Sequence, residues 1–180
     1  MLTGDVASLG VNSLQERLDA IGYAVQIGLR DPATTKWVMD AVAYTPHSNL
    51  PGAAEQQVVA VFEALKRSGK YRYHPRGTDR IQSLLATVKM RAWDCDQAVV
   101  FLVTALHILG FQTACIIMSA DEKVISHIWT QVGMPRNQPN HWVDLDPTTG
   151  PGGTPQSAVV GYAPPHRQRA WWKRYVFQFS

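Results

Sequence analysis

The apolar residues in the first part of the chain recur every three or four positions, which is the spacing of an amphipathic helix. They are Leu14, Leu18, Ile21, Val25 and Leu29. A capping box of Ser13 and Glu16 opens this predicted helix. Further helices are predicted from Pro32 onward, over residues 53–68 and over residues 78–88. The N-terminal part of the chain is therefore expected to be helical.

The most apolar segment is residues 98–109, which is apolar on nearly every face. This pattern predicts a central buried helix, and the segment is too short to span a bilayer. Asp94 is a good N-cap residue, and Gln97 completes a variant of the capping box. Gly110 stands where a helix commonly ends.

After this helix the pattern changes to alternation of apolar and polar residues. Strands are predicted over 112–118, 124–132 and 141–146, joined as an antiparallel meander, with a short earlier strand over 70–74. The segment 148–155 is rich in Gly and Pro, which predicts a wrapping loop.

The tail over residues 166–179 combines basic and aromatic side chains. Tyr175, Phe177 and Phe179 alternate, which favours a last strand added to the edge of the sheet. The alternative is an arm that docks on a neighbouring protein subunit, because aromatic residues and Arg are favoured at interface cores.

Composition is that of one globular domain, with 180 residues, 46% of them hydrophobic and 17% charged. We divide the domain 1–180 into a helical part (1–69), a core (70–149) and a wrapping loop with tail (150–180). The net charge of +3 is dispersed, so no nucleic-acid partner is expected. No export signal or membrane segment is visible, which predicts cytoplasmic synthesis and no membrane partner.

Cys95 is expected to be the first residue of the buried helix. There the unpaired backbone N–H groups and the helix dipole favour a thiolate and an oxyanion forming beside it. Asp94 and Asp96 oppose this ionisation, so an imidazolium partner is required.

His127 and a carboxylate can supply that partner. If Val132 pairs with His141, the paired residue numbers sum to 273, and Asp146 lies opposite His127 at a Cβ separation of roughly 5 Å. A register shift by two residues would place Asp144 there instead. The order of thiol, imidazole and carboxylate is typical of thiol acyl-transfer enzymes.

The remaining candidates have simpler interpretations. Cys115 lies among apolar residues of a predicted strand and is expected to be a core thiol, and His107 does not share a helical face with Cys95. The chain has no Cys-x-x-Cys or His-Glu-x-x-His motif, so neither a metal nor a cofactor is expected. Gln82 could donate to an oxyanion, but a solvent-facing helical position is favoured.

Three tryptophans lie close to the triad in the predicted arrangement, namely Trp93, Trp129 and Trp142. They could line an apolar substrate groove. The alternative is ordinary core packing.

With these residues in place, the chain resembles the transglutaminase-like superfamily, and more closely the transglutaminase-like cysteine peptidases of bacteria and tailed phages. The resemblance covers residues 71–149. It is carried by four segments in the family's usual order: Gly77-Thr78-Asp79-Arg80-Ile81-Gln82, Asp94-Cys95-Asp96, His127, and Trp142-Val143-Asp144-Leu145-Asp146-Pro147-Thr148. The chain departs from the family pattern at Trp93 and Gln97, where the family commonly has glycine and an acidic residue.

The resemblance implies an α+β papain-like, transglutaminase-core fold, with helices and the nucleophile helix packed on an antiparallel sheet. It implies that Cys95 is the nucleophile, His127 the general base and acid, and Asp146 the residue that orients His127. The expected activity is hydrolysis of an amide bond, peptide or isopeptide, in a peptide or protein substrate. Two alternatives are a cross-linking transglutaminase and a phage virion or assembly protein on the same fold, and a virion location is compatible with synthesis without export.

Overall fold

The computed structural model describes residues 14–45, 52–73, 81–119, 125–162 and 171–176. Its N-terminal part consists of helices α1 (Leu14–Arg30), α2 (Pro32–Ala41), α3 (Ala53–Ser68) and α4 (Leu84–Met90). The first three match the predicted helices, while Ser13 of the predicted capping box lies outside the described residues. The Asp31 carboxylate accepts a hydrogen bond from the backbone of Ala33, so α2 begins as its sequence indicates.

The segment between α3 and the nucleophile helix differs from the prediction. The helix expected over 78–88 begins only at Leu84, and Gln82 forms an isolated β-bridge instead. Residues 74–80 lie outside the described part. The helix ends at Arg91, which takes the left-handed conformation (φ +54°) that usually marks a glycine. No glycine stands at this position to mark the end of the helix.

Two short strands in this segment bring distant residues together. Strand β1 (Lys70–Tyr71) pairs in parallel with β2 (Ala92–Trp93), so Tyr71 lies beside Trp93. Strand β1 is shorter than predicted, and β2 was not predicted. A side chain on Gly69 would lie 2.3 Å from the backbone of Arg91, which explains why glycine precedes β1.

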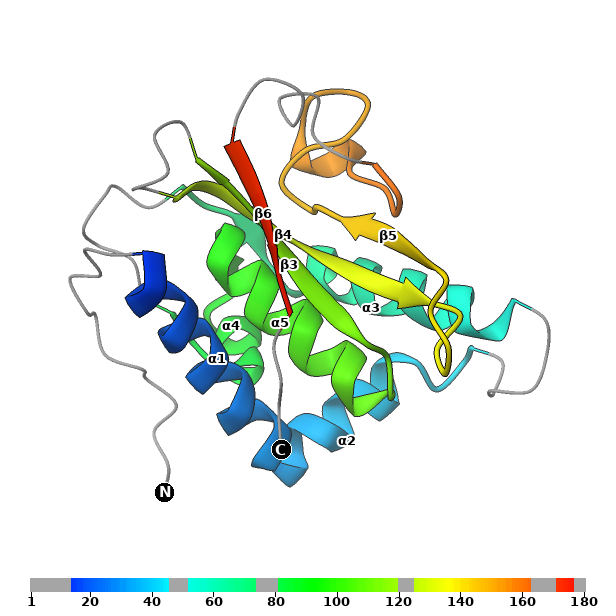
Figure 1. The fold of residues 1–180 in the computed structure, drawn as a ribbon. Coiled ribbons are helices and arrows are strands. Elements are labelled where there is room, and N and C mark those ends of the chain that lie inside the picture. Colours follow the sequence, from blue (N-terminus) through cyan, green and yellow to red (C-terminus); the bar gives the residue numbers. More distant parts are fainter. Residues whose placement is uncertain (1–13, 46–51, 74–80, 120–124, 163–170, 177–180) are drawn as a thin grey trace.

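Helix α5 (Cys95–Ile108) lies at the centre of the structure, between the other helices and the sheet (Figure 1). Its predicted capping box is confirmed in both directions. The backbone of Asp94 donates to the Gln97 side chain at 2.9 Å, and the backbone of Gln97 donates to the Asp94 carboxylate at 3.0 Å. All residues from Asp96 to Leu106 are buried, which confirms the central buried helix.

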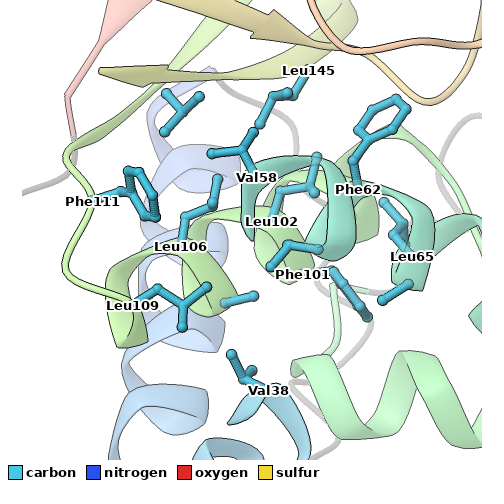
Figure 2. Close-up of a cluster of buried hydrophobic side chains, with 14 of the residues drawn as sticks. Val38, Val58, Phe62, Leu65, Phe101, Leu102, Leu106, Leu109, Phe111 and Leu145 are labelled. Carbon is cyan, nitrogen blue, oxygen red and sulfur yellow. The ribbon is translucent and has the colours of Figure 1, made fainter. Parts of the chain in front are cut away.

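Figure 2 shows one of the clusters that hold α5 in place. Phe101, Leu102 and Leu106 of α5 pack there against side chains of α2, α3 and β5. Truncating a buried leucine of such a cluster to alanine costs about 2–5 kcal/mol of stability. The position of Cys95 at the first turn is therefore fixed by extensive packing along the rest of its helix.

The antiparallel sheet has the strand order β5-β4-β3-β6. Strands β3 (Thr113–Ser119), β4 (Ile125–Met134) and β5 (His141–Leu145) form the predicted meander. Strand β6 (Trp171–Tyr175) pairs with β3, which confirms an edge strand in the tail. Of the alternating aromatics, Phe177 and Phe179 lie outside the described residues. No helix in the described ranges is long and apolar enough to cross a membrane.

The predicted register between β4 and β5 is wrong by two residues. Thr130 pairs with Leu145 and Met134 with His141, so paired numbers sum to 275. Strand β4 continues through Gly133 to Met134, whose side chain is buried in the core, and the connecting loop is shorter than expected. A shift by two keeps every side chain on its predicted face.

The two faces of the sheet have different roles. Cys115, Ile117 and Ile128 pack against α1 and α5, so Cys115 is a core thiol as predicted. The alternate residues Ile116, Met118 and Trp129 form a separate buried cluster on the opposite face. His127 shares that opposite face with Trp129.

Candidate active site

The imidazole of His127 is held by the carboxylate of Asp146. Nε2 of His127 lies 2.7 Å from Oδ2 of Asp146, whose side chain is fully buried. The other carboxylate oxygen accepts hydrogen bonds from Thr148, at 2.9 Å from its backbone N–H and 2.6 Å from its hydroxyl. Because Nε2 donates to the carboxylate, Nδ1 is the ring nitrogen that can accept a proton.

This contact forms even though the two residues are not directly opposite in the sheet. Strand β5 ends at Leu145, and the Asp-Pro-Thr turn that follows directs Asp146 toward His127. Asp146 is thus a diagonal neighbour of His127 rather than its ladder partner. The Thr148 hydroxyl, also in this turn, lies 3.4 Å from the imidazole.

Asp144, the alternative orienting residue, is engaged elsewhere. Its carboxylate accepts hydrogen bonds from the Trp129 indole at 2.8 Å and the Gln131 amide at 2.7 Å. The geometry therefore places Asp146, rather than Asp144, against the imidazole.

The thiol of Cys95 lies against the strand that carries His127. Cys95 is the first residue of α5 and is partly buried. The backbone N–H of Ile128, the residue after His127, hydrogen-bonds to the sulfur. Strand β5 has already ended at this level, so Ile128 has no β5 partner. The helix N-terminus and β4 thereby bring the sulfur to the residue that follows His127 in the chain.

The electrostatic surroundings keep this thiol protonated at rest. Burial is the largest cause that raises the pKa of Cys95 well above its ordinary value, followed by the negative charges of Asp96 and Asp94. The positive charge of Arg17 and the hydrogen bond from Ile128 act in the opposite direction. The predicted opposition of the two carboxylates is therefore present, and burial adds to it. A resting thiol of this kind needs a base at the moment of attack.

A comparison with known protein families matches residues 41–147 to the Transglutaminase-like superfamily, over more than half of the chain. The chain belongs to this superfamily. The matched segment contains α5, strand β4 with His127, and Asp146 directly after β5. Membership confirms the predicted α+β transglutaminase-like fold and supports a thiol hydrolase-like or transglutaminase-like activity.

Other comparisons add little. The search of curated proteins found no match. Among solved structures, the chain is similar to a protein from Parabacteroides distasonis ATCC 8503 that is described as a "putative protease". The TM-score is 0.48 and the identity 7%, over 65% of this chain and 24% of that one. The chain thus spans about a quarter of that protein's length.

One charged neighbour of the transglutaminase-like site comes from outside the matched segment. The guanidinium of Arg17 on α1 forms a forked contact with the carboxylate of Asp96, directly after Cys95. Sequence reasoning missed this pair, because 79 residues separate its members and no local pattern joins them.

Tyr71 is a second neighbour that sequence reasoning missed. Its ring packs edge-on against Trp93 at a centroid distance of 5.5 Å. Burial raises the pKa of the Tyr71 hydroxyl to about 12, with further contributions from interactions with Cys95, Asp94 and Asp146. Tyr71 therefore interacts electrostatically with two members of the candidate triad, Cys95 and Asp146.

The three tryptophans occupy different positions. Trp93 and Trp129 are 2% and 1% exposed, and Trp129 stacks on His127 at a centroid distance of 5.5 Å. Their burial fits the packing alternative rather than an open substrate groove. Trp142 is half-buried, with the Arg174 guanidinium 4.5 Å from its ring centroid. Tryptophan is a common core residue, so its presence near a nucleophile carries no signal of exposure.

Two polar groups near the start of α5 are buried. Gln82 is 2% exposed, which corrects the expectation of a solvent-facing helical residue. The indole nitrogen of Trp93 has no hydrogen-bond partner among the described residues. Within the same ranges, no group of three or more His, Cys, Asp or Glu side chains could hold a metal ion.

Proposed function

We propose that the chain is a thiol amidase of the transglutaminase-like type, which cleaves a peptide or isopeptide bond through an acyl-enzyme on Cys95. The observation that carries this proposal is the position of the Cys95 sulfur on the backbone N–H of Ile128, the residue directly after His127, together with the contact of Nε2 of His127 with Asp146. This arrangement leaves Nδ1 of His127 available as the base. Asp146 acts as the residue that orients the ring.

In the first step the Cys95 sulfur attacks the carbonyl carbon of the scissile amide while Nδ1 of His127 takes the thiol proton. The carbonyl oxygen becomes an oxyanion, and the negative charge of Asp146 stabilises the imidazolium. The backbone N–H of Cys95 stands at the first position of α5, where a helix provides no carbonyl partner, so it can donate to the oxyanion.

Collapse of the tetrahedral intermediate breaks the C–N bond. The imidazolium gives its proton to the leaving amine, and a thioester remains on Cys95. In the second half-reaction His127 takes a proton from water, which attacks the thioester. The products are a carboxylic acid and the regenerated thiol.

The same thioester can transfer its acyl group to an amine, which would give cross-linking instead of hydrolysis. The balance depends on whether water or an amine reaches the acyl group first. Family membership supports both outcomes equally, so the test must measure both.

The test is incubation of the purified full-length chain with a mixed peptide library containing Gln, Lys and isopeptide-linked peptides, with and without a fluorescent primary amine. Mass spectrometry would identify cleaved bonds, incorporated amine and released ammonia. We expect new carboxyl termini, with loss of all turnover in Cys95→Ala. The matched control is Cys115→Ala, which removes the other thiol.

Cleavage that persists in Cys95→Ala would contradict the proposal. Amine incorporation with ammonia release, absent in the same variant, would reassign the activity to acyl transfer. A library without any reaction, combined with an unreactive Cys95 thiol, would favour the structural or assembly role.

A further inference from the structure

We propose that Arg17 of α1 is a positioning residue of the active site, which neutralises Asp96 beside Cys95 and fixes the first turn of α5 against α1. The inference rests on the proposed role of Cys95 as the nucleophile. It extends the functional unit to a helix outside the family-matched segment 41–147.

The contact itself is well defined. Nε of Arg17 lies 3.1 and 2.9 Å from the two carboxylate oxygens of Asp96, and a terminal nitrogen lies 2.5 Å from Oδ2. The Asp96 side chain is 1% exposed and that of Arg17 is 16% exposed. A forked contact at this depth specifies orientation as well as charge, in contrast to a surface ion pair.

The buried carboxylate needs such a partner. Asp96 is the second residue of α5, next to the nucleophile, and its position in the first turn suits the helix dipole. Without a neighbouring cation its charge would act directly on the Cys95 sulfur. The Arg17 guanidinium neutralises the Asp96 carboxylate and also lowers the pKa of Cys95.

Asp94 acts on the thiol from its own element, and Tyr71 of β1 interacts with Cys95 from another side. On the sheet side the sulfur meets the backbone of Ile128, which follows His127, the partner of Asp146. The carboxylates oppose ionisation of the thiol, and Tyr71 stays neutral because its pKa is about 12. Arg17 is the cation that acts on the thiol from the helix side. Its removal therefore shifts the local balance toward negative charge.

The family-matched segment alone does not contain this cation. Helix α1 packs along α5 through Leu18, Ile21 and Val25. The same packing that buries these side chains carries Arg17 to the N-terminal end of α5. The apolar face of α1 thus also determines that the positive charge of Arg17 lies next to Asp96.

The test measures the rate of iodoacetamide alkylation of Cys95 against pH, by mass spectrometry, in the full-length chain. We expect Arg17→Gln to slow alkylation about tenfold at neutral pH and to move the pH midpoint upward, because the positive charge of Arg17 lowers the pKa of Cys95 and a change of about one pKa unit alters the thiolate fraction about tenfold. Arg17→Lys should retain most of the rate. Arg17→Gln combined with Asp96→Asn, a neutral pair, should return the rate to the wild-type level or above.

An unchanged midpoint in Arg17→Gln would overturn the inference. A double variant whose Cys95 is alkylated as slowly as in Arg17→Gln would also overturn it. That result would show that Arg17 only connects the two helices and has no electrostatic effect on the thiol. Arg30→Gln, an exposed arginine at the end of the same helix, is the matched control and should leave the midpoint unchanged.

Cys115, which is fully buried, reports the fold in the same spectra. If its labelling shows that Arg17→Gln does not fold, the double variant decides: a folded double variant at or above the wild-type rate supports the inference, and a slower one overturns it. Wild-type labelling of Cys95 no faster than that of Cys115 would instead remove the proposed function itself. The two failures are therefore distinguishable.

Discussion

Cys95 begins helix α5 and is partly buried, whereas Cys115 lies within strand β3 and is fully buried. Burial raises the pKa of Cys115 to about 12, and burial is also the largest cause of the raised pKa of Cys95. The thiols therefore differ less in their resting ionisation than in their neighbours. Cys95 accepts a hydrogen bond from the backbone of Ile128 and feels the charge of Arg17, while Cys115 lies among apolar side chains.

The comparison shows that position at a helix N-terminus does not by itself yield a resting thiolate here. Two carboxylates and burial outweigh the dipole and Arg17. In the proposed mechanism, the reactivity of Cys95 arises from proton transfer to His127 during attack. Mutation and changes of pH can therefore test how far the two thiols differ.

The largest expected difference is in the turnover of two variants, one lacking the Cys95 thiol and one lacking the Cys115 thiol. Cys95→Ala should lower turnover of any substrate found in the library test by about 10⁴-fold or more, the scale seen when a triad member is removed. Cys115→Ala should leave turnover within a few fold and cost about 1 kcal/mol of stability, because only core packing is lost. Steady-state rates and urea unfolding would measure both, and a Cys115→Ala enzyme without turnover would remove the contrast.

The next contrast concerns two nearby carboxylates, that of Asp144 in β5 and that of Asp146 directly after this strand. Asp146→Asn should lower kcat by about 10²–10⁴-fold, because the amide cannot stabilise an imidazolium and can present the wrong hydrogen-bond partner to Nε2. Asp144→Asn should mainly cost about 1–3 kcal/mol of stability, since it weakens the bonds from Trp129 and Gln131. Equal loss of kcat in both variants, with wild-type stability, would contradict the assignment of Asp146.

A smaller effect is expected from pH. Since the pKa of Cys95 is raised, the fraction of thiolate grows as pH increases, and alkylation should rise by up to about tenfold per pH unit between pH 6 and 9. Mass spectrometry at fixed iodoacetamide concentration would record this slope. A flat rate from pH 6 upward would instead indicate a preformed thiolate–imidazolium pair.

The smallest expected effect is that of Tyr71→Phe. Tyr71 has a pKa of about 12, so it carries no charge over the working range and cannot produce the alkaline rise. We expect the slope of the Cys95 profile to be unchanged and the rate to vary by less than about threefold. Loss of the slope in Tyr71→Phe would show that the alkaline rise depends on Tyr71 rather than on the ionisation of Cys95.

Local chemistry explains which features the sequence could predict. The capping box of Asp94 and Gln97 and the boundaries of α3 depend on neighbouring residues, so they were predicted to the residue. The contact of His127 with Asp146 was also predicted, although through a register that is wrong by two. The error arose because the length of the loop after β4 depends on the burial of Met134, which alternation alone does not reveal.

Features that depend on long-range packing could not be predicted. The pairing of Arg17 with Asp96 requires the placement of α1 along α5, and that of Tyr71 with Trp93 requires the β1–β2 pair. The end of α4 at Arg91 was missed because a non-glycine residue takes the left-handed conformation there. The burial of Trp93, Trp129 and Gln82 follows from the same tertiary contacts.

The most direct test of the central claim is the alkylation rate of both cysteines in wild type and in His127→Ala, read from the same spectra at pH 7 to 8. The account predicts that Cys95 reacts much faster than Cys115 in the folded chain and that His127→Ala removes most of this advantage. Labelling of Cys95 that is as slow as that of Cys115, or that does not depend on His127, would contradict it.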